Sequence, residues 1–198
     1  MGGEVRAGWT KALLAGTAGL PAAVRRSVDA ELGPEQRALI QDSINLRWIP
    51  LAAHLALLRG LRREATEETV VGLFVEATRL NVGPGGIFGK AASAALRWLT
   101  DDPFAVLRYA PTSTGYVFRG IGGVHVEEAT PDVRLLVHRD WPAELGEGDG
   151  FWLGWIGSLQ AALEAGVGDR PLRPKVTLDA LDVRAARAVF RCEVEVMP

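Results

Sequence analysis

The stretch Pro111–His138, PTSTGYVFRGIGGVHVEEATPDVRLLVH, holds the change of hydrophobic period that decides the fold. Before it, apolar residues recur every three or four positions, which is the period of an amphipathic helix. Within it, apolar and polar residues alternate in short runs separated by Gly or Pro, which predicts strands. The sequence therefore divides into a helical half, residues 1–110, and a sheet-plus-helix half, residues 111–198. We expect the two halves to form a single domain of residues 1–198.

The helical half carries clear start and stop signals. Gly33 closes one helix, and Pro34 suits the first turn of the next because its missing N–H is not needed there. Thr66 is predicted to cap a further helix. The predicted helices are Thr10–Leu32 with an interruption near Pro21, Pro34–Trp48, Pro50 to about Arg63, one after Thr66, Ala91–Leu99, and one capped by Asp101 and Asp102 that reaches Tyr109.

The second half reads as strands around one further helix, Phe151–Ala165. The predicted strands are Tyr116–Arg119, Val124–Glu128, Val133–His138, Lys175–Asp179 and Arg187–Val196. Helices followed by paired strands, without β-α-β alternation, indicate an α+β fold with an antiparallel sheet. We therefore expect the helical half to pack with a sheet of about four to five strands crossed by one central helix.

The last strand alternates most regularly. Phe190, Cys192 and Val194 share one face, whereas Arg191 and Glu193 take the other. This predicts that Cys192 is buried and inert, with a raised pKa. It is the only cysteine, which fits a reducing compartment, and we expect a cytoplasmic protein.

Composition and charge exclude several classes of partner. The chain has 198 residues, 48% of them hydrophobic, and a formal net charge of -2. Basic and acidic residues are mixed along it, so no electrostatic field gathers nucleic acid or anionic lipid. The longest charge-free runs, Gly150–Leu163 and Ala12–Val24, are too short to cross a bilayer. We expect neither a nucleic-acid nor a membrane partner.

Two glycine-rich loops imitate nucleotide-binding motifs. Gly83–Lys90 ends in Gly-Lys, but Ala91 stands where a magnesium-binding hydroxyl is required. Gly120–Gly123 is followed by an alternating strand where a dinucleotide fingerprint needs a helix. We interpret the first as a helix–helix connection and the second as a turn or bulge.

The histidines, His54, His125 and His138, show no metal-ligand spacing, so we expect no haem, no zinc and no other cofactor. His54 lies in an apolar helix and is expected in the core. His125 and His138 are predicted on the polar face of the sheet because their strand neighbours are apolar. No serine lies in a nucleophile elbow, and no catalytic residue is assigned.

The helix Phe151–Ala165 carries a stripe of small residues, Gly154, Ser158, Ala161 and Ala165, beside a tryptophan stripe. The small stripe could line a cavity, form a self-association face, or allow close packing. We predict close packing at Gly154 and Ser158, because a glycine at such a position commonly serves close approach.

The arrangement resembles a bacterial domain family of unknown function, distantly similar in its C-terminal half to 4-vinyl-reductase domains, haem-NO-binding-associated domains and TRAPP subunits. The resemblance rests on four short motifs, Trp48–Pro50, Asp102–Phe104 with Leu107, Gly150–Gly154, and Arg187–Val196. It implies a sensor-like scaffold with a hydrophobic pocket and frequent dimerisation. The Tyr-x-Ser-x-Arg haem signature and the cysteines of metal-bearing relatives are absent, so haem and metal are not carried over.

The sequence favours a non-catalytic ligand-binding or signalling module that takes a small apolar ligand between its halves, and we expect a homodimer. The candidate ligand-binding residues are Trp48, His54, Trp98, Phe118, Trp152 and Trp155. Two alternatives stay open. One is an enzyme with a polar site around His138, Arg134 and Arg119, and the other is a structural subunit that binds a partner protein.

Overall fold

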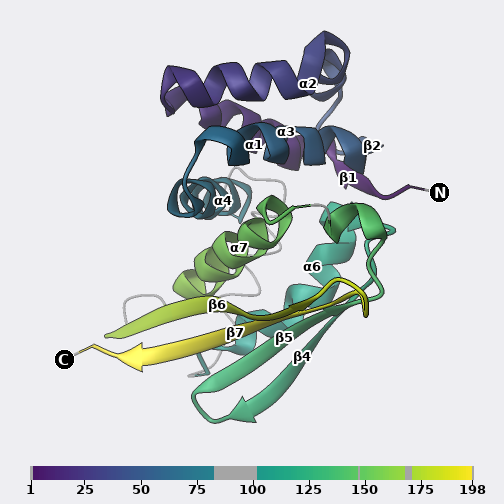
Figure 1. Cartoon of the computed structure of the whole chain (residues 1–198). Coiled ribbons are helices and arrows are strands. Elements are labelled where there is room, and N and C mark those ends of the chain that lie inside the picture. The colour runs from purple at the N-terminus through teal and green to yellow at the C-terminus, as the bar shows by residue number, and fades with distance from the viewer. Residues whose placement is uncertain (1, 83–101, 147, 168–170, 198) are drawn as a thin grey trace.

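A computed structural model of the chain (Figure 1) describes residues 2–82, 102–146, 148–167 and 171–197. Its helices are α1 (Ala7–Gly16), α2 (Ala22–Asp42), α3 (Leu51–Glu64), α4 (Glu67–Val82), α6 (Ala110–Val117) and α7 (Gly150–Val167), with 3₁₀ turns η1 (Thr17–Gly19), η2 (Ala105–Tyr109) and η3 (Ala143–Gly146). Its strands are β1 (Glu4–Arg6), β2 (Trp48–Pro50), β3 (Phe118–Arg119), β4 (Gly123–Thr130), β5 (Val133–Arg139), β6 (Leu172–Asp182) and β7 (Arg187–Val196).

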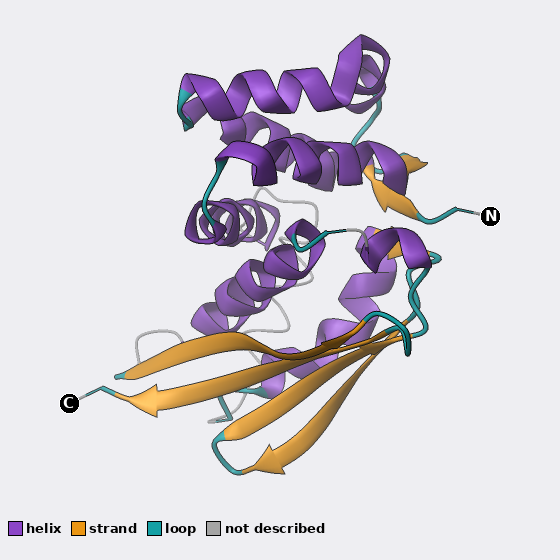
Figure 2. Cartoon of the chain, viewed as in Figure 1, coloured by secondary structure: helices purple, strands orange, loops and turns teal. Residues whose placement is uncertain are grey.

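The architecture is the predicted α+β fold. The large sheet has four antiparallel strands in the order β4-β5-β7-β6, and a small sheet has the order β2-β1-β3. Figure 2 shows the helices of the N-terminal half stacked above the large sheet, with α7 between them. The predicted central helix is therefore confirmed, as are four of the five predicted strands.

The predicted break in the second helix is confirmed at Gly33, which has φ 61° inside α2. This left-handed conformation favours glycine because a Cβ would be strained there. Pro34 then begins the second limb, where its fixed φ suits a first helical turn. The sequence Gly33–Pro34 thus bends α2 into two limbs.

Two predicted elements are wrong. The helix predicted to reach Trp48 ends at Asp42, because Ser43 is extended and Trp48 instead pairs with Arg6 in a strand. The strand predicted from Tyr116 begins at Phe118, after α6. In both cases the strand is only two or three residues long and depends on pairing with β1, which local periodicity does not reveal.

The predicted cap at Thr66 is confirmed, whereas the helix predicted to follow Asp102 is the 3₁₀ turn η2, whose N-cap is Phe104 without a side-chain cap bond. The backbone N–H of Thr69 donates to Thr66 Oγ1 at 3.2 Å, and that of Phe104 donates to Asp102 Oδ1 at 2.9 Å. The loop Gly83–Lys90, the helix Ala91–Leu99, Trp98 and Asp101 lie outside the described residues.

The core between α7 and the sheet contains the predicted face of β7. Ala188, Phe190 and Cys192 are fully buried, and Phe190 stacks on Trp155 of α7 with ring centroids 5.9 Å apart. Burial raises the pKa of the Cys192 thiol to about 12. The prediction of a buried, unreactive cysteine is confirmed for its burial and for the direction of its pKa.

α4 and α7 pack so closely that two glycines are required between them. A Cβ at Gly154 would lie 2.6 Å from the ring of Phe74, and one at Gly157 would lie 2.4 Å from the carbonyl oxygen of Val71. Close packing at Gly154 is therefore confirmed, whereas Ser158 is only half-buried. Gly157 makes the tighter backbone contact, although the predicted small-residue stripe did not include it.

No helix within the described ranges has the length and apolar character needed to cross a membrane.

Candidate functional site

The candidate site centres on His54, which α3 places at the junction of the two halves. His54 is fully buried, and its Nδ1 lies 3.1 Å from Thr10 Oγ1 on α1. Its ring meets Phe74 of α4 and Phe118 of β3 in edge-on geometry, with centroids 6.3 Å and 5.8 Å away. Four elements thus fix one imidazole in an apolar surrounding.

Burial keeps this imidazole neutral. Desolvation of the charged form lowers the pKa of His54 to about 3. The Nε2 atom is buried and has no hydrogen-bond partner among the described residues. A buried polar atom left in this state costs about 1 to 3 kcal/mol. Within the described residues, Nδ1 of His138 is also buried without a hydrogen-bond partner.

A chain of aromatic rings runs from His54 to the second buried histidine. Phe118 meets Phe151 at 5.7 Å, and Phe151 meets His138 at 6.3 Å. His138 in turn lies 5.4 Å from Trp155, ring centroid to ring centroid. The rings connect α3 and β3 to α7 and the large sheet, so a displacement at His54 has a packed route to the sheet.

His138 is not on the polar face of the sheet, so that prediction is wrong. It is fully buried, its Nε2 lies 2.7 Å from the carbonyl oxygen of Ile121, and desolvation lowers its pKa to about 4. Val137, on the opposite face of β5, is fully buried too. Because both faces of this strand are covered, alternation could not tell which face meets α7. His125 is exposed, as predicted.

The structure brings together only some of the predicted ligand-binding residues. His54 and Phe118 are in contact, whereas Trp152 and Trp155 surround His138 instead. Trp48 lies apart, with the guanidinium carbons of Arg6 and Arg119 at 3.8 Å and 4.1 Å from its ring centroid.

Three residues of the site were missed by sequence reasoning: Thr10, Phe74 and Phe151. Thr10 is 44 positions from His54, so no local pattern could pair them. Phe74 and Phe151 looked like ordinary core positions of amphipathic helices.

The residues named for a polar catalytic site do not converge. Arg134 pairs with Glu128 at 3.4 Å and donates to the carbonyl oxygen of Thr130, while Arg119 stacks on Trp48. His138 faces rings rather than either arginine. The described residues offer no polar cleft around His138 of the kind that general acid or base chemistry uses.

Comparison with solved structures identifies the fold. The chain is similar to the Fe(II) unliganded H-NOX protein from K. algicida, with a TM-score of 0.64, 9% identity and 96% of each chain covered. It is also similar to an H-NOX protein from S. oneidensis in the Fe(II)NO ligation state, with a TM-score of 0.59, 10% identity, and 95% of this chain and 98% of that chain covered. The chain has the H-NOX fold. No protein-family model and no curated protein matches it.

The H-NOX fold agrees with the haem-NO-binding part of the resemblance drawn from the sequence. The comparisons give no support to a relation with 4-vinyl-reductase domains or TRAPP subunits. At about 10% identity the likeness shows the fold alone, so no ligand is transferred from it.

The residues present do not fit a haem. Neither tyrosine begins the haem signature, because Tyr109 is followed two and four positions on by Pro111 and Ser113, and Tyr116 by Phe118 and Gly120. The ring of Phe118 instead fills space against His54. Elsewhere between the halves, Gly154 and Gly157 bring α4 and α7 into direct contact. Within the described residues, Phe118 and the close α4–α7 contact therefore occupy space between the two halves.

Proposed function

We propose that this chain is a non-catalytic sensing module that binds a small, mostly apolar ligand beside His54, without haem. The observation that carries the proposal is the unpartnered Nε2 of a fully buried, neutral imidazole. The site lies where α1, α3, α4 and β3 meet. A ligand there would contact both halves of the chain at once.

The chemistry of the site limits the ligand. The rings of Phe74 and Phe118 favour an apolar body, and Nε2 supports one hydrogen bond. A charged ligand would lose its hydration without a counter-charge, which is strongly unfavourable. The hydroxyl of Thr10 can donate to Nδ1 or accept from it, so Nε2 is free to be either acceptor or donor. We therefore propose a neutral molecule of a few heavy atoms with one polar atom.

Sensing requires that the ligand bind one arrangement of the halves better than another. Phe74 provides such a coupling, because its ring contacts His54 and also packs directly against Gly154 of α7. Phe118 gives a second route through Phe151. Occupancy beside His54 would therefore move α7 relative to α4, and with it the sheet.

The test uses ¹⁵N-labelled protein titrated with 2-propanol, while the imidazole nitrogens are observed by NMR. We expect a saturable shift of His54 Nε2, and no saturable shift of the exposed His125. In the same titration, the backbone amide signals of Phe74 and Phe118 should also shift in a saturable way. His54→Phe should abolish these amide shifts, whereas the control His125→Gln should keep them. Shifts that grow linearly and equally at both histidines would contradict the proposal, because they would report only a change of solvent.

Haem is tested separately. Protein expressed with added haem precursor should purify without a Soret band, and a stoichiometric band removed by His54→Ala would contradict the haem-free site.

A second candidate function is self-association, and a group of exposed apolar residues favours it. Ile44 and Leu46 are 75% and 59% exposed, and Tyr116 is 58% exposed. Arg6 connects them, since it donates to the carbonyl oxygens of both Leu46 and Tyr116. Exposed apolar groups of this kind are typical of protein interfaces. Light scattering should give a dimer that Leu46→Asp converts to a monomer, and a monomeric parent would contradict this candidate.

A further inference from the structure

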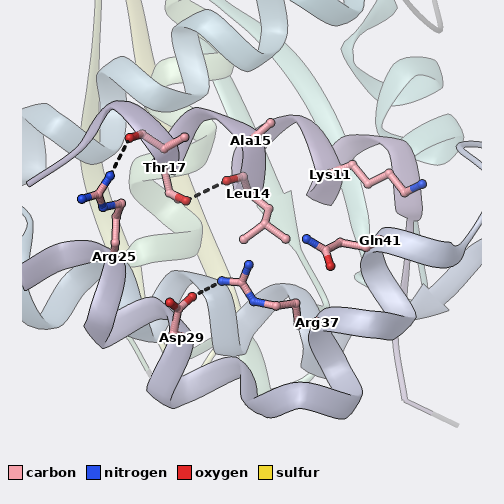
Figure 3. A pocket seen from close by; sticks show the side chains of 9 residues that line it. Lys11, Leu14, Ala15, Thr17, Arg25, Asp29, Arg37 and Gln41 are labelled. Carbon is pink, nitrogen blue, oxygen red and sulfur yellow. Dashed lines mark hydrogen bonds and ion pairs between the residues drawn. The ribbon is translucent and has the colours of Figure 1, made fainter. Parts of the chain in front are cut away.

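A second place for a ligand lies between α1 and α2, away from His54. It is a cleft of about 420 Å³, within the range of small-molecule sites (Figure 3). Its lining combines basic, polar and small apolar side chains: Lys11, Leu14, Ala15, Thr17, Ala18, Arg25, Asp29, Arg37 and Gln41.

The bend in α2 builds this cleft. Because Gly33 has φ 61°, the limb before it and the limb after it both face α1. Asp29 and Arg37, one on each limb, form an ion pair across the bend. Arg25 Nη1 donates to the carbonyl oxygen of Ala18 at 3.2 Å, where η1 follows α1. Two cationic side chains are thus held in place by the fold before any ligand arrives.

The charges of the cleft do not cancel. Lys11, Arg25 and Arg37 contribute three positive charges and Asp29 one negative charge, which leaves an excess of two positive charges. Lys11 and Gln41 lie at one end of the cleft in Figure 3, and within the described residues neither side chain has a hydrogen bond or ion pair. The whole chain, in contrast, has a net charge of -2, so this local excess is opposite in sign.

We propose that the α1–α2 cleft binds a small organic anion, with a carboxylate or phosphate group near Lys11 and Arg37 and a short alkyl body on Leu14 and Ala15. The basic side chains provide charge-assisted hydrogen bonds to the anionic group. The small apolar side chains allow the alkyl part to leave water. This site is independent of the proposed ligand at His54 and needs a different kind of molecule.

The first test titrates ¹⁵N-labelled protein with hexanoate, hexyl phosphate and hexanol, and follows backbone amides by NMR. We expect saturable shifts at Lys11, Thr17 and Arg37 with one or both anions in the millimolar range. The two anions distinguish a carboxylate site from a phosphate site. Shifts of equal size with hexanol, or none with either anion, would overturn the proposal.

Two variants that should change the affinity for the anion in opposite directions distinguish a binding effect from simple damage to the fold. Lys11→Gln removes an unpaired cation and should weaken binding about fivefold, the upper range for one exposed charge pair. Asp29→Asn releases Arg37 and should tighten binding by a similar factor, which a destabilised fold would not do. Arg184→Gln and Asp132→Asn, at the exposed turns of the large sheet, are the matched controls and should leave the affinity unchanged. Equal changes in variants and controls would overturn the proposal.

Discussion

The two buried histidines have similar burial but different partners. His138 Nε2 lies 2.7 Å from a backbone carbonyl oxygen, which can only accept, so that nitrogen must carry the proton. His54 Nδ1 lies 3.1 Å from the hydroxyl of Thr10, which can donate or accept. One environment therefore fixes the tautomer and the other does not.

This difference separates a structural histidine from a candidate binding histidine. His138 is enclosed by Phe151, Trp152 and Trp155 on α7, and its Nε2 bond attaches β5 to the segment before β4. His54 can change the hydrogen-bonding character of its unpartnered nitrogen at little cost. Nδ1 of His138 is also buried without a partner, but because Nε2 carries the proton it can only accept, whereas Nε2 of His54 can either accept or donate.

The largest expected effect is acid destabilisation, to which both histidines contribute. Their pKa values fall from 6.5 to about 3 for His54 and about 4 for His138, so protons bind the unfolded chain more tightly. The contribution of the two histidines to stability is therefore complete above pH 6.5, and it is lost as the pH falls towards their pKa values in the folded protein. From pH 7 to pH 5, each histidine should lower the free energy of unfolding by about 2 kcal/mol.

Urea denaturation as a function of pH measures this loss. His54→Phe and His138→Phe should each remove about half of the pH dependence, whereas His125→Gln, at an exposed position, should change it little. A parent protein with equal stability at pH 7 and pH 5 would show that neither histidine is buried in the neutral form.

The next effect concerns Phe74, which touches both His54 and the Gly154 position. Gly154→Leu should destabilise the protein by about 1 to 3 kcal/mol, since overpacking outweighs a helix-propensity gain of under about 1 kcal/mol. Gly72→Leu on α4 is the control, because a Cβ there meets nothing within 4 Å. A urea midpoint that is unchanged or raised in Gly154→Leu would contradict the close contact between α4 and α7.

The sequence predicted those parts of the fold that follow a single periodicity. β7 was assigned with the correct inner face because its outer residues are charged, and α7 was assigned because its apolar residues extend over several turns. β2 was not predicted and the start of β3 was placed two residues too early, because strands of two or three residues depend on pairing with β1. His138 was placed on the wrong face because the other face of β5 is also apolar and buried.

The candidate site was predictable only in part. His54 was expected in the core from its apolar helix, and Phe118 was named with it. The partners Thr10, Phe74 and Phe151 come from α1, α4 and α7, and only the folded chain brings them to one place.

A smaller effect distinguishes the two histidines directly at pH 7, where both are neutral. His138→Phe removes the donor to the carbonyl oxygen of Ile121 and should cost about 1 to 3 kcal/mol. His54→Phe removes an unpartnered nitrogen. The hydroxyl of Thr10 then loses its partner, but it can donate to the backbone carbonyl four residues earlier in α1. The substitution should therefore cost less than about 1 kcal/mol of stability. Urea midpoints at pH 7 compare them, and equal costs would contradict the assignment of different roles.

The smallest expected effect lies at Cys192, which shares the core beneath α7 with His138. Cys192 is opposite Arg134 on β5 and Val176 on β6, and burial raises the pKa of its thiol to about 12. Cys192→Ala removes one buried sulfur atom and should cost about 1 kcal/mol, close to the value for a buried methylene. Labelling by a thiol reagent at neutral pH should be far slower in the native protein than in urea. Native labelling as fast as that of the unfolded chain would show that the sheet opens beneath α7. The surroundings of His138 would then not be rigid enough to fix its tautomer, and the contrast with His54 would fail.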